Sequence, residues 1–350
     1  MVMRIGILGL AHAHVVTYAQ QWLANPAWDV KPVLAWDHDS ARLTRQTQSL
    51  KIAAADSSQQ LVDSPEIDAV VIGSETAYHA DHVELAARAG KTIILQKPLA
   101  LTLDQGQRIV KAIEQTGVPF TLAWQMRTDP QNLQMKQMVD EGVLGRIFMV
   151  RRRHGLPTQA WPWLASSWHA SRELNRGMWA DDACHAADFL LWLLGEPVSV
   201  MAQVATLHSP QVPDDQGAAI FRYADGTLAT VESSFTCLAA ENTTEIIGEK
   251  GSIIQNYGDV PSCNHPREAV PSGLKWHLQG TPGWTYSDIP SPASHGQRIA
   301  GLAQPLAEFL HGRRPAIATA QEGLQALRMI AASYESSQTG RLVELASLSS

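Results

Sequence analysis

Three residues carry side chains suited to moving a proton to or from a bound oxygen atom. Asp181 and His185 are four positions apart in a segment with helical periodicity, which would put both on one helix face, about 5–6 Å apart at Cβ. Histidine titrates near neutrality, so His185 could accept a hydroxyl proton, and Asp181 could orient it or hold a neighbouring hydroxyl. Lys97 follows an apolar strand pattern, where open α/β sheets bind ligands, and its ammonium could stabilise charge on the reacting oxygen.

Each of these residues also has an ordinary structural interpretation. A single histidine in an apolar helix is usually a hydrogen-bonded structural group, and an aspartate at a helix start, such as Asp181 or Asp182, is usually an N-cap. A single loop lysine is usually solvated. Taken one at a time, the three residues therefore do not identify a site. Asp188, in the same apolar segment, is expected to be a hydrogen-bonded structural group at a domain junction.

The N-terminal residues could bind the phosphates of a dinucleotide. An apolar strand pattern at residues 4–8 ends at Gly9, and a helix pattern follows, so backbone N–H groups and the positive helix end would face a pyrophosphate. Of the glycines in G-x-G-x-x-G only Gly9 is kept, because Ala11 and His14 occupy the second and third positions. A strand-to-helix turn without a ligand is the alternative.

Asp37 ends the second strand pattern, and its position bears on the choice of cofactor. A carboxylate there accepts hydrogen bonds from the adenosine ribose hydroxyls and repels a 2′-phosphate. His38, not arginine, follows directly, so the sequence favours NAD over NADP. An N-cap role for Asp37 is the alternative, although Asp39 or Ser40 could fill that role.

His12 and His14 flank this turn, and their roles stay open. They could lie near the cofactor phosphates or the nicotinamide, pack in place of the missing glycines, or reach the substrate. The helix dipole would favour neutral imidazole there. A metal site is disfavoured because no third ligand is evident nearby in the sequence, and no metal is expected.

The elements that must position these residues fall into two groups. The first alternates strands with helices, which predicts a parallel α/β dinucleotide-binding domain over residues 1–123; its expected strands are residues 4–8, 30–36, 69–72, 92–95 and 120–123. The second has one strand pattern at residues 147–153 and, from residue 198, several strand patterns in succession without intervening helices, which predicts an α+β domain with a mostly antiparallel open sheet over residues 124–350. A helix is expected at 181–194, and a long surface loop in the Pro-, Gly- and Ser-rich span 258–297.

Composition limits the classes of partner and compartment. The net charge is −7 and the only tight basic run is residues 151–153, so nucleic acid is not expected as a partner. Cys184, Cys237 and Cys263 form no CxxC pattern, so neither a disulfide framework nor a zinc site follows. No signal peptide or membrane-spanning stretch is evident. A cytoplasmic location is the simplest expectation.

Several motifs, in order along nearly the whole chain, resemble the Gfo/Idh/MocA oxidoreductases, the relatives of glucose-fructose oxidoreductase and inositol dehydrogenase. They are residues 70–74 with His79, Gln-Lys-Pro at 96–98, AWQMRTDP at 123–130, the helix at 177–197 and the closing segment 312–341. The family usually has Glu-Lys-Pro and D-x-G-x-H-x-x-D; this chain has Gln96 and Ala183 instead, and keeps Asp181, His185 and Asp188.

The resemblance implies a Rossmann domain and an α+β domain whose open sheet forms a homodimer or homotetramer interface. It also implies that Lys97, Asp181 and His185 form the catalytic set. With the motif analysis above, it gives the expected cofactor-binding residues, which are Gly9, Ala11, His12, Ala13, Asp37, His38, Ser74, His79, Gln96, Lys97 and Gln125.

Four tryptophans precede the 181–194 helix, and they bear on the substrate. Flat indole faces suit the apolar faces of sugar rings, although packing between domains is the ordinary interpretation of any one of them. His169 and Arg172 could add polar contacts, and Arg172 would suit an acidic substituent. The expected substrate-binding residues are Lys97, Arg127, Trp163, Trp168, His169, Arg172, Asp181 and His185, and the other two tryptophans are Trp161 and Trp179.

Three functional hypotheses follow. The first is an NAD(H)-dependent dehydrogenase that oxidises a secondary alcohol of a sugar, an inositol or a sugar acid, so that the partner is a small carbohydrate or polyol. The second is a glycoside-cleaving enzyme that uses NAD for transient oxidation followed by elimination, with no net redox change. The third is a non-catalytic NAD- and sugar-binding sensor, motivated by the degraded glycine motif and Gln96.

Overall fold

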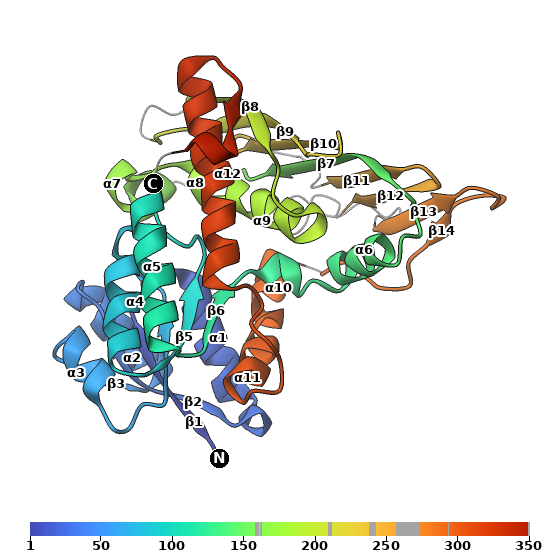
Figure 1. Ribbon diagram of the computed structural model, residues 1–350. Helices are drawn as coiled ribbons and strands as arrows, with labels where there is room; N and C mark the ends of the chain where they lie inside the picture. Colours follow the sequence, from blue (N-terminus) through green and yellow to red (C-terminus); the bar gives the residue numbers. More distant parts are fainter. Residues whose placement is uncertain are drawn as a thin grey trace.

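Two β-sheets organise the chain, one in each half of the molecule (Figure 1). The computed structural model describes residues 1–157, 161, 163–208, 212–237, 243–256, 273–292 and 294–348. A six-stranded parallel sheet is followed by a nine-stranded, mostly antiparallel sheet. The predicted fold class is therefore confirmed.

The first sheet has the strand order β3-β2-β1-β4-β5-β6. Its strands are β1 (Met3–Leu8), β2 (Val30–Trp36), β3 (Ala53–Ala54), β4 (Ala69–Ile72), β5 (Thr92–Gln96) and β6 (Phe120–Ala123). Helices pack on both faces of this sheet, so its central strands are continuously apolar. The helices are α1 (Ala13–Ala24), α2 (Ser40–Leu50), α3 (Ser58–Asp63), α4 (His79–Arg88) and α5 (Leu103–Thr116). The two-residue strand β3 and the short helix α3 were not predicted.

The strand order reverses between β1 and β4, which is where open α/β sheets bind their ligands. The turn after β1 requires glycine at this point. Gly9 has φ +86°, and a Cβ on it would lie 2.5 Å from the backbone of Ser74. The chain that follows β4 therefore passes directly against the turn, and any larger residue would push the two strand ends apart.

The second sheet has the order β14-β13-β12-β11-β7-β10-β9-β8-β15. Only its β7–β10 pair is parallel among the described pairings. The strands are β7 (Ile147–Gly155), β8 (Ser199–Ala205), β9 (Gln216–Arg222), β10 (Leu228–Ser234), β11 (Thr243–Gly248), β12 (Gly251–Asn256), β13 (Leu274–Leu278), β14 (Thr285–Tyr286) and β15 (Val343–Glu344).

The long loop predicted for residues 258–297 is wrong in part. Strands β13 and β14 and the start of a helix lie within it, whereas residues 257–272 and 293 lie outside the described residues. Composition misled here because Pro, Gly and Ser surround a β13 of only five residues. That strand gains its hydrogen bonds from β12, a long-range pairing that local sequence does not encode.

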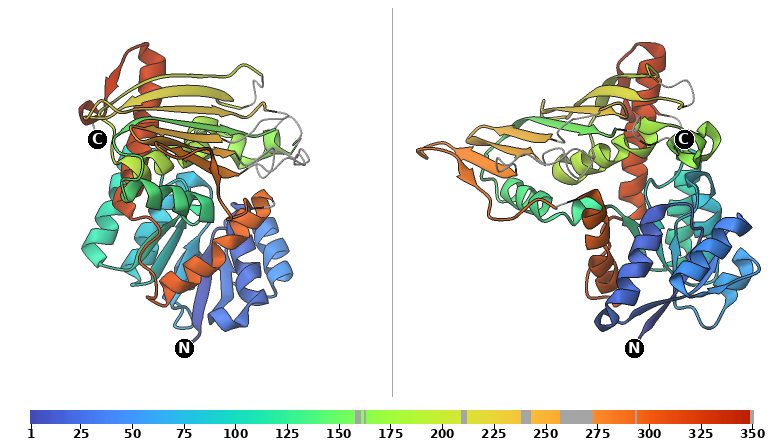
Figure 2. Two further views of the ribbon diagram at one scale, coloured as in Figure 1. Left: turned by 90° about the vertical axis from the view of Figure 1, so that its right-hand side faces the viewer. Right: turned by 180° about the vertical axis from the view of Figure 1, so that it is seen from behind.

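Helices cover one face of the second sheet and join it to the first domain (Figures 1 and 2). Helices α6 (Pro130–Asp140), α9 (Ala183–Leu194) and α12 (Ala320–Thr339) lie between the two halves. Helices α10 (His295–Gly301) and α11 (Ala303–Leu310) return to the first domain and pack against α1. No helix in the described part of the chain has the length and hydropathy needed to cross a membrane.

A buried ion-pair network holds this junction together. Arg127 donates to Asp188 of α9, with Nη2 2.8 Å from Oδ1, and to Glu322 of α12 at 2.5 Å. The Arg127 side chain is 4% exposed and that of Asp188 is fully buried. Arg127 was expected to bind substrate. Its guanidinium instead forms ion pairs with α9 and α12, and so links these two helices to the segment that carries Arg127. Asp188 has the structural role expected of it.

Removing one partner of this network should destabilise the protein. Asp188→Ala leaves the buried Arg127 guanidinium with Glu322 as its one remaining carboxylate partner among the described residues, which is expected to cost about 3–5 kcal/mol. Asp140→Asn, which breaks the exposed Lys136–Asp140 pair on α6, should cost less than about 1 kcal/mol. Urea unfolding followed by circular dichroism measures both. Equal, small losses would show that the buried network contributes little.

Candidate active site

Lys97 and Asp181 meet in a buried ion pair between the two halves of the molecule. Lys97 follows β5, and its Nζ donates to Asp181 Oδ1 at 2.8 Å and to the Asp181 carbonyl at 2.9 Å. Asp181 ends the short helix α8 (Met178–Asp181). Its second oxygen lies 2.7 Å from Nδ1 of His169. Because a carboxylate only accepts, the Nδ1 atom of His169 carries the proton.

The charges of this group are mutually stabilising. Burial alone would raise the pKa of Asp181, but the charges and hydrogen bonds of Lys97 and His169 outweigh it and hold the pKa well below 3.8. Burial would lower the pKa of Lys97, but Asp181 raises it above the ordinary value. Lys97 is therefore a charged hydrogen-bond donor at neutral pH, as stabilising charge on a substrate oxygen requires.

His185 lies in the first turn of α9, and its place corrects one expectation. The helix predicted from residue 181 is broken: α8 ends at Asp181, and α9 begins only at Ala183. Asp181 and His185 therefore do not share a single helix face. The carboxylate of Asp181 contacts Lys97 and His169 instead of orienting His185.

The His185 imidazole is neutral and incompletely hydrogen-bonded. Its Nε2 lies 3.5 Å from Nε2 of Gln125, and its Nδ1 is buried with no partner among the described residues. Burial, and then the charges of Lys97 and His154, lower the pKa of His185 well below 6.5. A neutral imidazole can accept a proton, and the free ring nitrogen is an atom that a bound hydroxyl could contact.

A second histidine–carboxylate pair lies beside His185, and sequence reasoning missed it. His154, on β7, has Nδ1 2.6 Å from Asp182 Oδ2, and Ser233 donates to the same oxygen at 3.1 Å. The rings of His154 and His185 are 6.2 Å apart. The alternation along β7 turns His154 inward, but only the sheet pairing brings that strand under α9, so the sequence held no direct signal.

The turn after Gly9 retains the features that bind a phosphate. The amide groups of Ala11 and Ala13 make no hydrogen bond within the described residues, whereas His12 N–H donates to the Gly73 carbonyl at 2.9 Å. Helix α1 has no acidic residue in its first turn. Two free donors at the positive end of a 12-residue helix fit a pyrophosphate.

His14 fills the space that a third glycine would leave. Its Nδ1 is 2.9 Å from Nε2 of Gln96, and the Tyr18 hydroxyl donates to Oε1 of Gln96 at 3.2 Å. An amide can donate to one partner and accept from the other, which a carboxylate cannot do. This pairing explains Gln96 in place of the family's glutamate. No group of three metal ligands occurs in the described part of the chain.

His12 faces the second domain. Its ring lies 5.9 Å from that of His169 and 5.8 Å from that of Trp168, whose indole donates to the Ala11 carbonyl at 3.2 Å. Burial, followed by the charges of Lys97 and His169, lowers the pKa of His12 well below 6.5. The imidazole is thus neutral and lies between the turn and the Lys97–Asp181 pair.

Asp37 lies at the carboxyl end of β2. Its Oδ2 accepts from Leu10 N–H at 2.6 Å and from Arg42 Nε at 2.8 Å. Arg42 also donates to Glu75 at 2.9 Å. His38 is half-exposed and 3.7 Å from both carboxylates. Sequence reasoning considered only the residue after Asp37, and so missed Arg42, which the first turn of α2 directs back toward it.

The remaining predicted residues have different places. Ser74 is buried against Gly9, and His79 contacts the carbonyls of Pro98, Leu99 and Ser74. Burial lowers the pKa of His79 to about 4, so His79 is a neutral side chain with a structural role.

The other residues predicted to bind substrate differ in their exposure. The ring of Trp168 stacks on that of His169, with 3.8 Å between the ring centres. Trp163 is 56% exposed and stacks on Trp161, and Arg172 is exposed at the start of α7 (Arg172–Asn175).

The comparisons with known proteins agree with this architecture. Residues 3–123 match the family described as "Oxidoreductase family, NAD-binding Rossmann fold", and residues 132–254 match the "GFO/IDH/MocA C-terminal domain".

Levoglucosan dehydrogenase of Pseudarthrobacter phenanthrenivorans is 27% identical over 288 residues, which are 73% of this chain and 74% of that protein. D-apiose dehydrogenase of Paraburkholderia graminis is 25% identical over 326 residues, which are 89% and 82% of the two chains. The scyllo-inositol 2-dehydrogenase (NAD(+)) of Bacillus subtilis is 29% identical over 203 residues, only 56% of its length and 55% of this chain.

Solved structures show the same fold. Levoglucosan dehydrogenase in complex with NADH and levoglucosan has a TM-score of 0.82 at 22% identity, covering 99% of this chain and 100% of that chain. An oxidoreductase from Agrobacterium radiobacter in complex with NAD+, L-tartaric acid and magnesium has a TM-score of 0.80 at 20% identity, covering 99% of each chain. With two family domains matched in order, the chain belongs to the Gfo/Idh/MocA family of oxidoreductases, and its residues 3–123 form an NAD-binding Rossmann domain.

Proposed function

We propose that the protein is an NAD(H)-dependent dehydrogenase acting on a secondary alcohol of a sugar, an inositol or a sugar acid. The proposal rests on the buried, charged Lys97, which is paired with Asp181. It rests also on the neutral His185, whose pKa is lowered by burial and then by the charge of Lys97. Relatives with 25–29% identity are named for levoglucosan, D-apiose and scyllo-inositol, which are all polyhydroxylated rings or chains.

The residues present fit the cofactor that the family implies. The free amides of Ala11 and Ala13 would hold its pyrophosphate, and Asp37 with His38 would border its adenosine ribose. Gln96, the last residue of β5, and Gln125, two residues beyond β6, would border the nicotinamide end. When bound, a nicotinamide would accept or return the hydride of the alcohol carbon.

The chain's own residues would then handle the oxygen and its proton. Lys97 would donate a hydrogen bond to the alcohol oxygen and stabilise the negative charge that develops as its proton leaves. His185, neutral at physiological pH, would accept that proton. Asp181 would keep Lys97 protonated and fixed in place, and His169 would orient Asp181. The reverse sequence reduces a ketone.

A substrate screen tests the function directly. The enzyme is incubated with NAD and with monosaccharides, inositols and sugar acids, and NADH absorbance is followed at 340 nm, the ordinary wavelength for this cofactor. Net NADH formation supports the dehydrogenase. Cleavage of a glycoside with no NADH accumulation would favour transient oxidation and elimination instead. Cofactor and sugar binding without any turnover would favour the sensor.

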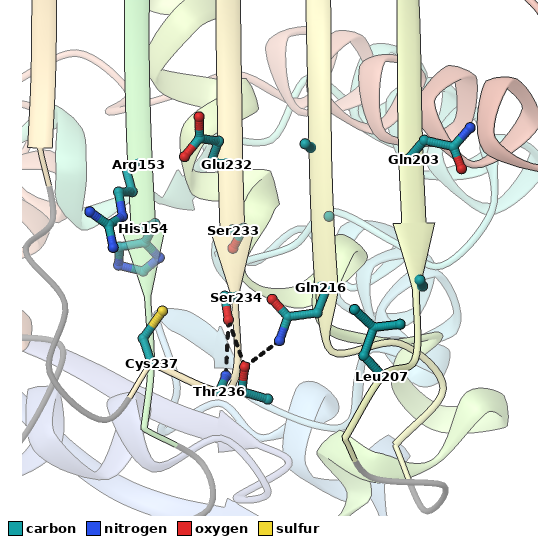
Figure 3. A pocket seen from close by; sticks show the side chains of 13 residues that line it. Arg153, His154, Gln203, Leu207, Gln216, Glu232, Ser233, Ser234, Thr236 and Cys237 are labelled. Atoms are coloured by element: carbon teal, nitrogen blue, oxygen red, sulfur yellow. Dashed lines mark hydrogen bonds between the residues drawn. The ribbon is translucent and has the colours of Figure 1, made fainter.

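The outer face of the second sheet is proposed to pair with a second copy of the chain, giving a homodimer or homotetramer. Exposed apolar side chains alternate with buried ones along its strands: Phe148, Met201, Ile220 and Leu228 are 36–50% exposed. A cavity of about 600 Å³ also opens on these strands, and Arg153, Glu232 and Gln203 line it (Figure 3). Light scattering in solution would measure the mass. A monomer at micromolar concentration would rule this pairing out.

Replacing His185 should separate chemistry from cofactor binding. We expect His185→Ala to lower kcat about 10²–10⁴-fold, the usual contribution of a general base, while the Kd of NADH changes little. His277→Ala, on strand β13, is the matched control and should leave both unchanged. A parallel loss of turnover and NADH binding would show that His185 supports the fold and not the chemistry.

The pH dependence of oxidation should reflect the lowered pKa of His185. The imidazole must be neutral to accept a proton, and a lowered pKa keeps it neutral to more acidic pH. The acid limb of kcat/KM should therefore lie well below pH 6.5, with little loss between pH 8 and 6.5. An acid limb centred at the ordinary histidine pKa, absent in His185→Ala, would contradict the buried environment described for this ring.

A further inference from the structure

Two buried carboxylates and one guanidinium meet at the carboxyl ends of β2 and β4. Asp37 and Glu75 are each 3% exposed, and the Arg42 side chain is 14% exposed. Arg42 Nη2 bridges the two acids, at 2.7 Å from Asp37 Oδ1 and 2.9 Å from Glu75 Oε1. With both acids ionised, the triad has a net charge of −1. It lies beside the β1–β4 switch point, on the side of β2.

The carboxylate oxygens of Asp37 and Glu75 differ in how many hydrogen bonds they accept. Each oxygen of Asp37 already accepts two hydrogen bonds: Oδ2 from Leu10 N–H and Arg42 Nε, and Oδ1 from Asp39 N–H and Arg42 Nη2. Glu75 differs, because its Oε2 is buried without a partner in the described part of the chain. A buried carboxylate oxygen without a donor is costly. A ligand hydroxyl could supply that donor, whereas a phosphate could not.

An arginine near the β2 carboxylate would ordinarily suggest a 2′-phosphate site and hence NADP. The geometry argues otherwise, because Nε and Nη2 of Arg42 are already committed to Asp37 and Glu75. Burial alone would lower the pKa of Arg42, but the two carboxylates outweigh it and raise the pKa above the ordinary value. The guanidinium is thus neutralised by one acid, and the second acid leaves an excess negative charge.

We propose that Glu75 sets the preference of this protein for NAD over NADP. It holds Arg42 away from a 2′-phosphate, adds the excess negative charge that repels one, and offers its unpaired oxygen to a ribose hydroxyl. Asp37, whose oxygens are saturated, positions Arg42 and the turn. This inference rests on the proposed NAD site, and it assigns the discrimination to a residue outside the β2 carboxylate and the turn after Gly9.

The experiment measures the Kd of NADH and of NADPH by fluorescence titration, in wild-type protein and in Glu75→Gln, which removes the charge but keeps the shape. We expect wild-type protein to bind NADH at least 100-fold more tightly than NADPH. In Glu75→Gln that ratio should fall at least tenfold, mainly through tighter NADPH binding. Adding Arg42→Ala to Glu75→Gln should abolish the gain, because the released guanidinium is what would bind the phosphate.

Asp39→Ser is the matched control. It also removes one negative charge near the triad, but serine can still cap α2 as Asp39 does through its bond to Arg42 N–H. Its NADH-to-NADPH ratio should stay within threefold of wild type. Melting temperatures are measured for every variant, and Glu75→Ala replaces Glu75→Gln if the latter does not fold.

The outcomes separate this inference from the proposed function. An unchanged ratio in a folded Glu75 variant, with NADH still bound, would overturn the role of Glu75 and leave the dehydrogenase intact. A wild-type preference for NADPH would overturn it too, and would reassign Arg42 as a phosphate ligand. Failure of wild-type protein to bind either dinucleotide would overturn both the inference and the proposed function.

Discussion

The buried Lys97–Asp181 ion pair is the interaction on which the site depends. Lys97 follows the carboxyl end of β5 in the parallel sheet, and Asp181 comes from the helices beneath the antiparallel sheet, so the pair forms only when the two halves are docked. Removing two charges from water is unfavourable unless they compensate each other. Here the compensation is completed by His169. The same contact therefore joins the domains and keeps the Lys97 ammonium charged although its side chain is only 6% exposed.

Most of the fold could be predicted from local pattern, because strands buried on both faces must be continuously apolar. The bounds of β2 (Val30–Trp36), β4 and β6 follow directly from such runs. Strands β3, β13 and β14 could not be predicted in the same way. They are short, and their stability comes from hydrogen bonds to distant strands and not from their own residues.

The order of the motifs along the chain was enough to predict some of the residues that approach one another, but not the contacts that each of them makes. Lys97 and Asp181 were brought together as expected, but the spacing of Asp181 and His185 suggested a shared helix that the structure breaks at Asp182. Arg127 was expected to bind substrate, yet it is buried against Asp188 because a guanidinium at a three-way junction needs carboxylate partners. Ion-pair partners far apart in sequence leave no periodic signal, which is why the ion pairs of Arg127 were not predicted.

The hydrogen bond from Trp168 to the Ala11 carbonyl has a consequence for turnover. The indole belongs to the second domain, yet it rests on the turn that would grip the dinucleotide. Loss of the spent cofactor would therefore require the two halves to part locally and the indole to swing away, before the next molecule enters. Movement of Trp168 would then have to accompany each exchange of NADH for NAD, so the rate of turnover would depend on how readily the two halves separate at this contact.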